Sequence, residues 1–236
     1  MKNKSSVREI KARFDQDVER FSNLETGQIS TIDAEISLEL ITSAAKAICP
    51  DALNILDVGC GAGNYTLKML TKIPHINCTL IDLSPAMLER ANQRVSKEIN
   101  GKIQVIEGDI RDIELEDETF EIILAGAVLH HLRDDDDWQF VFTKLFNALT
   151  TGGCLMISDL IAQDTENITK MIWEKYGDYL EKNGGHDYRT KVLDYIEKED
   201  SPRSLNYQIE LMKKVGFRKV EILHKNLCFA AFGGIK

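Results

Sequence analysis

The sequence predicts an α/β protein built on a doubly wound, mostly parallel β-sheet. Short apolar runs alternate along the chain with stretches in which apolar residues recur at helical spacing. The run FEIILAGAV at 120–128 is apolar nearly throughout, which is typical of a strand covered on both faces. Strands that alternate with helices in this way favour a parallel sheet with a helical layer on each side.

Five apolar runs predict parallel strands, at 54–58, 78–83, 103–109, 120–128 and 154–160. A helix is expected at 64–73, and the next one begins with Ser84 and Pro85, a capping residue followed by proline at the first helical position. The stretch DDDDWQFVFTKLFNAL at 134–149 gives the clearest amphipathic helix, and the aspartates favour its N-terminus.

The alternation breaks after the fifth run, and 161–203 is polar, aromatic and irregular. A helix resumes near Leu205 and stops at Gly216, and the runs RKVEILH and NLCFAAF then close the chain as a strand pair. We therefore expect four parts, which are an N-terminal helical cap (1–49), a ligand-binding core (50–160), a lid insert (161–203) and a closing helix and strand pair (204–236).

Composition narrows the class of function. Among the 236 residues, no apolar run reaches the ~18 residues of a membrane span, and the start of the chain has no signal-peptide core. The net charge of -9 argues against a large nucleic-acid surface. The five cysteines are scattered without a C-x-x-C pair, so we expect neither a metal site nor disulfides, and a cytoplasmic location.

Three glycines follow the first expected strand within the stretch ILDVGCGAGNYTL at 55–67. Glycine is the most costly residue to order, so Gly59, Gly61 and Gly63 indicate that the backbone must come close to a ligand there. Ligands of open α/β sheets bind at the carboxyl ends of the strands. We therefore expect a binding site at this loop, together with Asp57 at the end of the strand.

Acidic residues also end the next two expected strands. Asp82 can accept hydrogen bonds from both hydroxyls of a ribose, and Asp109 can accept one from an exocyclic amine. Either aspartate alone could be a loop cap, but both together fit an adenosine lying across the first three strands.

A nicotinamide dinucleotide also contains an adenosine, and the loop spacing argues against it. The dinucleotide fingerprint is G-x-G-x-x-G, whereas this loop reads G-x-G-x-G with Asn64 at the sixth position. A tight turn that binds no ligand is the other interpretation of the glycines. A nicotinamide-dependent oxidoreductase is therefore the least favoured function.

Three segments, LDVGCGAGNYT, LIDLSPAMLERA and VIEGDIRDI, resemble the nucleotide-site motifs of class I S-adenosylmethionine-dependent methyltransferases, and AGAVLHHL and LTTGGCLMISD look like that family's next two strands. The resemblance implies a Rossmann-like, seven-stranded sheet with one antiparallel strand, and S-adenosylmethionine as cofactor. It also implies contacts for seven residues: Gly59 and Gly61 at the methionine portion, Asp82 at the ribose, Asp109 and Ile110 at the adenine, Leu83 over the other face of the ring, and the Ala125 backbone at the methionine amino group.

Methyl transfer from a sulfonium depends largely on holding the acceptor in line, and a base is needed only where the acceptor loses a proton. His130 and His131 follow the fourth strand and Asp159 ends the fifth, so these three are the candidate catalytic residues. His186 lies in the insert. The structural alternative is that one of the paired histidines packs, the other caps a helix, and Asp159 is only a strand-end residue.

Aromatic residues flank the expected site on both sides. Phe14 and Phe21 in the N-terminal RFDQDVERF either close over the cofactor or mediate dimerisation. Those of the insert either pack a substrate or form the core of the lid: Trp173, Tyr176, Tyr179, Tyr188 and Tyr195.

We predict methyl transfer from S-adenosylmethionine to a small-molecule acceptor. SPAMLER, VIEGDIRDI and the early FD are also similar to the carboxy-S-adenosylmethionine synthases of tRNA modification. That reaction needs an arginine for the added carboxylate. The resemblance puts Leu193 at that position, with Arg189 and Arg203 nearby. The synthase and a non-catalytic cofactor-binding subunit stay as alternatives.

Overall fold

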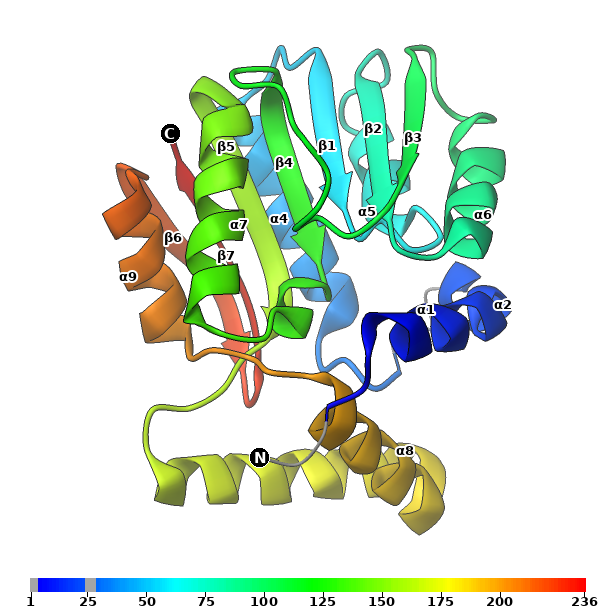
Figure 1. The fold of residues 1–236 in the computed structure, drawn as a ribbon, viewed down its shortest axis with the longest axis vertical. Coiled ribbons are helices and arrows are strands. Elements are labelled where there is room, and N and C mark those ends of the chain that lie inside the picture. The colour runs from blue at the N-terminus through cyan, green and yellow to red at the C-terminus, as the bar shows by residue number, and fades with distance from the viewer. Residues whose placement is uncertain (1–3, 24–28) are drawn as a thin grey trace.

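The computed structural model describes residues 4–23 and 29–236, and its centre is a seven-stranded sheet (Figure 1). The strands are β1 (Asn54–Val58), β2 (Asn77–Asp82), β3 (Ile103–Glu107), β4 (Phe120–Gly126), β5 (Leu149–Leu160), β6 (Lys219–Asn226) and β7 (Phe229–Ile235). They lie in the order β3-β2-β1-β4-β5-β7-β6. Strands β1 to β5 pair in parallel, and β7 runs antiparallel between β5 and β6. The predicted doubly wound sheet is confirmed.

Helices cover both faces of the sheet. The helices α4 (Ala34–Ile48), α5 (Asn64–Leu70) and α6 (Pro85–Val95) contribute buried side chains to one apolar cluster. The helices α7 (Asp135–Ala148) and α9 (Leu205–Val215) do so on the opposite face, where Trp138 and Phe142 are completely buried. The two clusters explain why the central strands are apolar on both sides.

Local signals in the sequence mark the helix ends as expected. The Ser84 hydroxyl accepts a hydrogen bond from the Met87 amide at the start of α6, and the Asp134 carboxylate accepts one from the Asp137 amide at the start of α7. Helix α9 ends at Gly216, whose φ of 130° a side chain would disfavour. These caps fix where each helix leaves the sheet.

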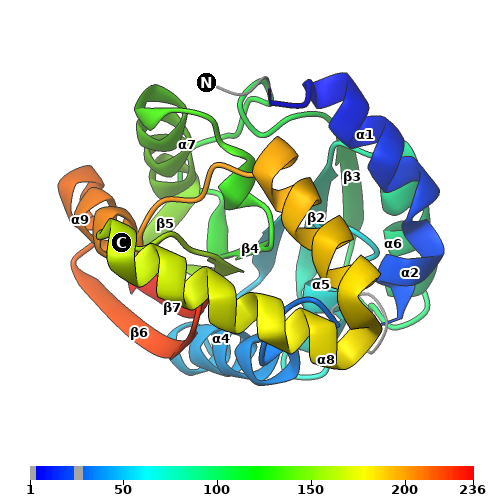
Figure 2. The same cartoon turned by 90° about the horizontal axis from the view of Figure 1, so that it is seen from below.

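Four further elements gather at the carboxyl ends of the parallel strands (Figures 1 and 2). They are α1 (Val7–Gln16), α2 (Val18–Ser22), the short 3-10 helix η1 (Leu129–His131) and α8 (Glu166–Glu199). Helix α8 has two arms that meet at Gly185, which has a φ of 82° and a ψ of 178°. The insert that we expected to be irregular is therefore mainly helical.

Helix α4 divides the expected N-terminal cap. It packs against β5 and β7 and belongs to the sheet's helical layer, whereas α1 and α2 contact α6 at the site end. Leu38, Ile41 and Ala45 give α4 an apolar stripe at helical spacing, which explains its place in the core. Among the described residues, none of the helices is long and apolar enough to cross a membrane.

Candidate functional site

A cavity of about 450 Å³ lies at the carboxyl ends of β1 to β5, beneath α1, α2 and α8. Its wall includes the glycine loop after β1, the ends of β2 and β4, and the histidines of η1. This volume is typical of a site for a small molecule. The elements that make the wall are far apart in the sequence, so the cavity exists only in the folded chain.

The glycine loop forms the part of the wall nearest β1. Gly59 and Gly61 have φ values of 65° and 50°, which favour glycine. A Cβ at Gly59 would collide with Val128, whereas one at Gly61 would meet nothing within 4 Å. Gly61 thus leaves its backbone open to a ligand. Gly63 faces α6 instead and does not line the cavity.

Asp82 lines the cavity at the end of β2. Its Oδ2 accepts a hydrogen bond from the Gly61 amide and its Oδ1 accepts one from the Ser84 amide, both at 2.8 Å. Burial raises the pKa of Asp82 to about 6. Each carboxylate oxygen can accept a second hydrogen bond, so Asp82 can still receive two ribose hydroxyls.

Asp109, Ile110 and Leu83 also line the cavity, beside Asp82. The Arg111 guanidinium donates to both carboxylate oxygens of Asp109, at 2.9 and 2.6 Å. Burial alone would raise the pKa of Asp109, but Arg111 outweighs burial and holds the pKa below its ordinary value. This part of the wall therefore offers a charged acceptor beside two apolar side chains.

Besides Gly63, two more of the expected cofactor residues, Asp57 and Ala125, lie behind the wall. The Asp57 carboxylate accepts hydrogen bonds from the amide and hydroxyl of Thr66, at 3.2 and 2.6 Å, and its burial raises its pKa to about 7. Asp57 is thus bound to the first turn of α5. Ala125 is buried within β4, and the next residue, Gly126, lines the cavity in its place.

The first of the paired histidines, His130, is held by Asp159. The Asp159 carboxylate accepts hydrogen bonds from the Leu129 amide at 2.8 Å and the His130 amide at 3.2 Å, and it contacts His130 Nδ1 as an ion pair. Burial alone would lower the pKa of His130, but Asp159 and Asp200 outweigh it and raise the pKa to about 9. Asp159 therefore fixes η1 and the His130 ring.

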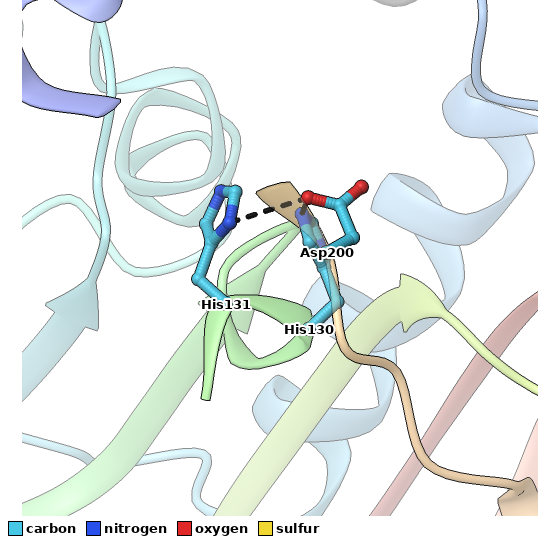
Figure 3. Close-up of side chains that lie close together, drawn as sticks. All are labelled: His130, His131 and Asp200. Carbon is cyan, nitrogen blue, oxygen red and sulfur yellow. Dashed lines mark ion pairs between the residues drawn. The ribbon is translucent and has the colours of Figure 1, made fainter. Parts of the chain in front are cut away.

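His130, His131 and Asp200 converge at one point of the cavity wall (Figure 3). Asp200 Oδ1 lies 3.3 Å from His131 Nδ1 and 3.7 Å from His130 Nε2. Burial, together with the charge of His130, holds the pKa of His131 well below its ordinary value. Phe14 of α1 packs edge-on against the His131 ring, with 5.9 Å between the ring centroids.

Aromatic residues of α1, α2 and α8 cover the cavity. Phe14 and Phe21 both line it, and their ring centroids are 5.7 Å apart. Of the aromatic residues expected in the insert, Tyr176, Tyr188 and Tyr195 line the cavity, whereas Trp173 and Tyr179 do not. His186 is exposed on α8 and is not part of the wall.

Sequence reasoning missed Asp200 and Arg13. Asp200 follows the charged stretch IEKE and looks like part of a solvated face, yet it is buried against His130. Arg13 lies on α1 and donates to the Glu199 carboxylate, with 2.9 Å between Nη2 and Oε2. Both depend on the return of α8 to η1, where the Ser201 amide donates to the His130 carbonyl.

These residues fit S-adenosylmethionine. The open backbone at Gly61 and the free acceptor capacity of Asp82 suit a ribose and the adjoining chain, and Ile110 and Leu83 offer an apolar pocket for adenine. The cavity continues from there to Gly126 and the histidines. The part of the cavity beside Gly126 and the histidines could hold the acceptor, and a sulfonium methyl group that pointed into this part would face the acceptor.

Comparisons with known proteins agree with this fit. The family described as methyltransferase domain matches residues 55–153. A carboxy-S-adenosyl-L-methionine synthase from Vibrio atlanticus is 28% identical over 187 residues, which are 78% of this chain and 76% of that protein. The one from Escherichia coli O1:K1 is 25% identical over 206 residues, or 84% of this chain and 81% of that protein.

Solved structures show the same fold. Human N-acetylserotonin methyltransferase in complex with S-adenosylmethionine matches with a TM-score of 0.62 and 14% identity. The match covers 96% of this chain and 56% of that enzyme, so this chain spans little more than half of the human enzyme's length. The matched domain, the relatives and the fold make this chain similar to the class I S-adenosylmethionine-dependent methyltransferases, whose cofactor is S-adenosylmethionine.

Proposed function

We propose that the chain transfers the methyl group of S-adenosylmethionine to a small-molecule acceptor. One observation carries the proposal: a single cavity joins the glycine loop and Asp82 to His131 and Asp200. Bound cofactor supplies an activated methyl group, and the protein's task is to hold an acceptor atom in line with it. A covered cavity of about 450 Å³ suits a small acceptor better than a polymer.

The residues divide into two groups in this proposal. In the cofactor half, Asp82 accepts the ribose hydroxyls and Asp109 an adenine amine. In the acceptor half, His131 and Asp200 contact the acceptor. Asp159 is a positioning residue, since its carboxylate is bound to η1 and to His130.

A second candidate is synthesis of carboxy-S-adenosylmethionine, and the relatives of that name favour it. The arginines near the expected position give it less support. Arg189 pairs with Glu181 and Arg203 with Asp135, and neither lines the cavity. Among the arginines that line the cavity, Arg13 is paired with Glu199, and an added carboxylate there would have to compete with that ion pair. Arg20, Arg111 and Arg133 line the cavity as well.

A reducing cytoplasmic location and homodimer formation belong to the proposal as well. All five cysteines are free, which supports the reducing compartment. Because Phe14 and Phe21 line the cavity, we propose that they cover the cofactor and that a dimer uses another surface. Cell fractionation and sedimentation of the purified chain test these two points.

The test is donor turnover with a fractionated metabolite extract and S-adenosylmethionine that carries a labelled methyl group. We expect S-adenosylhomocysteine and one labelled small molecule in equal amounts. A ligand that carries one more carboxylate, about 44 mass units above S-adenosylmethionine, would support the synthase instead. Tight donor binding without any turnover of the extract would support a non-catalytic subunit.

A further inference from the structure

The cluster of His130, His131 and Asp200 has the dimensions of a metal site. One ligand atom from each residue lies within 4.8 Å of the others, and Asp200 Oδ1 is 3.3 Å from one ring and 3.7 Å from the other. Ligand atoms bound at about 2.0–2.2 Å from a shared ion lie about 3–3.5 Å apart. A small inward movement of the side chains would therefore complete the coordination.

Three atoms of this cluster lack ordinary hydrogen-bond partners. Asp200 Oδ1 and both ring nitrogens of His131 make no hydrogen bond of normal geometry with the residues that the structure describes. The Asp200 side chain is only 2% exposed. Buried polar atoms in proteins nearly always have a partner, and a bound ion can supply one where neighbouring protein groups do not.

His130 is oriented as a metal ligand would be. Asp159 holds Nδ1 of the ring, which leaves Nε2 directed toward Asp200. A carboxylate behind the ring of a ligating histidine fixes its orientation and raises its basicity. The Asp159 carboxylate also accepts hydrogen bonds from the Leu129 and His130 amides of η1, which makes this orientation rigid.

Charged groups of both signs surround the cluster. They include Asp159, Glu199, Asp200, Lys4, Arg13 and Arg133. The cations are already engaged: Arg13 with Glu199, and Lys4 and Arg133 with backbone carbonyls. A divalent ion would add positive charge to the site, which suits an anionic acceptor atom.

We propose that His130, His131 and Asp200 bind one divalent transition-metal ion of the Zn²⁺ or Fe²⁺ type. Two imidazole nitrogens and one carboxylate favour such ions over Mg²⁺ or Ca²⁺, and three protein ligands leave a position open. That position faces the cavity and takes an oxygen or sulfur atom of the acceptor. The role of the ion in holding the acceptor rests on the proposed methyl transfer, but the metal site itself does not.

The test uses the full chain without an affinity tag, treated with a chelator and then titrated with Co²⁺ alone. Visible absorption of the bound ion and calorimetry are the readouts. We expect one Co²⁺ per chain, and loss of binding in His130→Gln, His131→Gln and Asp200→Asn. His186→Gln is the matched control, since this histidine is exposed and outside the cavity. Asp159→Asn should weaken binding about 10- to 100-fold.

Binding of S-adenosylhomocysteine to each variant separates this proposal from the proposed function. Circular dichroism identifies any variant that fails to fold. The Co²⁺ affinities of the variants that do fold then decide whether the metal site exists. No Co²⁺ binding by wild type, or equal binding by wild type and the folded ligand variants, overturns the metal site even if S-adenosylhomocysteine binds. If the wild-type chain fails to bind S-adenosylhomocysteine, that result contradicts the proposed function and not the metal site.

Discussion

Asp82 links the sequence motif to the chemistry of the cofactor half. Asp82→Ala removes the proposed acceptor of two ribose hydroxyls and also the partner of the Gly61 amide. We expect the affinity for S-adenosylhomocysteine to weaken by on the order of 1.5–3 kcal/mol, as for hydrogen bonds to a charged group. Calorimetry measures this loss. Asp117→Ala, at an exposed loop position, is the control and should bind as wild type does.

Unchanged affinity in a folded Asp82→Ala chain would contradict the assignment of the ribose position. Tighter binding of NADH than of S-adenosylhomocysteine by wild type would do the same, because it would restore the dinucleotide interpretation of the loop.

The raised pKa of Asp82 predicts that cofactor affinity depends on pH. The pKa is about 6 in the free chain because burial disfavours the charged form. Only the ionised carboxylate accepts both hydroxyls, so binding favours ionisation. The dissociation constant of S-adenosylhomocysteine should stay level above pH 7 and rise up to about tenfold per pH unit below 6.

Asp82→Asn cannot ionise at this position and should remove that pH dependence while binding weakly at all pH values. Calorimetry between pH 5 and 8 tests both chains. A wild-type dissociation constant that does not change across this range would show that Asp82 does not contact the ligand's donors.

His131→Ala should affect turnover more than cofactor binding. The ring lies in the acceptor half, and its removal leaves Gly61 and Asp82 in place. With an acceptor identified, we expect kcat/KM to fall while the dissociation constant of S-adenosylhomocysteine stays within about twofold of wild type. Equal losses in both quantities, or loss of folding, would favour a structural role for His131.

Single residues show how far sequence reasoning reached. The place of Gly59, Gly61, Asp82 and Asp109 in the cavity wall could be predicted because each lies at or just after the end of a strand, and strand ends meet at one edge of a parallel sheet. Asp200 could not, because its contact with His130 depends on how α8 returns across the cavity. No short-range pattern in the sequence predicts that the C-terminal end of α8 comes back to η1.

At the scale of elements, α1, α2 and α8 are expected to act as a lid. They supply Phe14, Phe21, Tyr188 and Tyr195 to the cavity wall but no strand of the sheet. Hydrogen exchange of the backbone amides in 7–22 and 166–199 should slow when S-adenosylhomocysteine is added. The amides of β4 and β5, deep in the sheet, serve as the internal control.

Strong protection of both segments without ligand would contradict a lid that moves. Slowing confined to the strands would also contradict it, since the ligand would then bind without ordering α1 or α8.

Helix α8 shows why one element was misjudged. Ile172, Tyr176 and Leu180 recur every four residues and pack in a cluster with Leu160 and Phe229, so a helical signal was present. The glycines of KNGGHDY suggested a loop, but Gly185 only kinks the helix. The arm after Gly185 buries a different face of the helix. The apolar residues of α8 therefore do not form one continuous stripe along the whole helix.

At the scale of the whole molecule, the mostly parallel sheet was predictable, whereas the way in which α1 and α8 cover the strand ends was not. Alternation and apolar runs determine a parallel sheet locally, and the β5 to β7 pairing confirms the antiparallel strand that the resemblance implied. The approach of α1 and α8 to the strand ends depends on long-range pairs such as Arg13 with Glu199. Such pairs carry no periodic signal in the sequence.

The central claim is that one cavity holds the cofactor at Asp82 and presents its sulfur to His131. A crystal structure of the chain with S-adenosylhomocysteine tests it most directly. We predict that the ribose hydroxyls donate to Asp82, that adenine lies between Leu83 and Ile110, and that the sulfur faces the acceptor half. A ligand bound elsewhere, or one whose sulfur faces away from His131, would contradict the account.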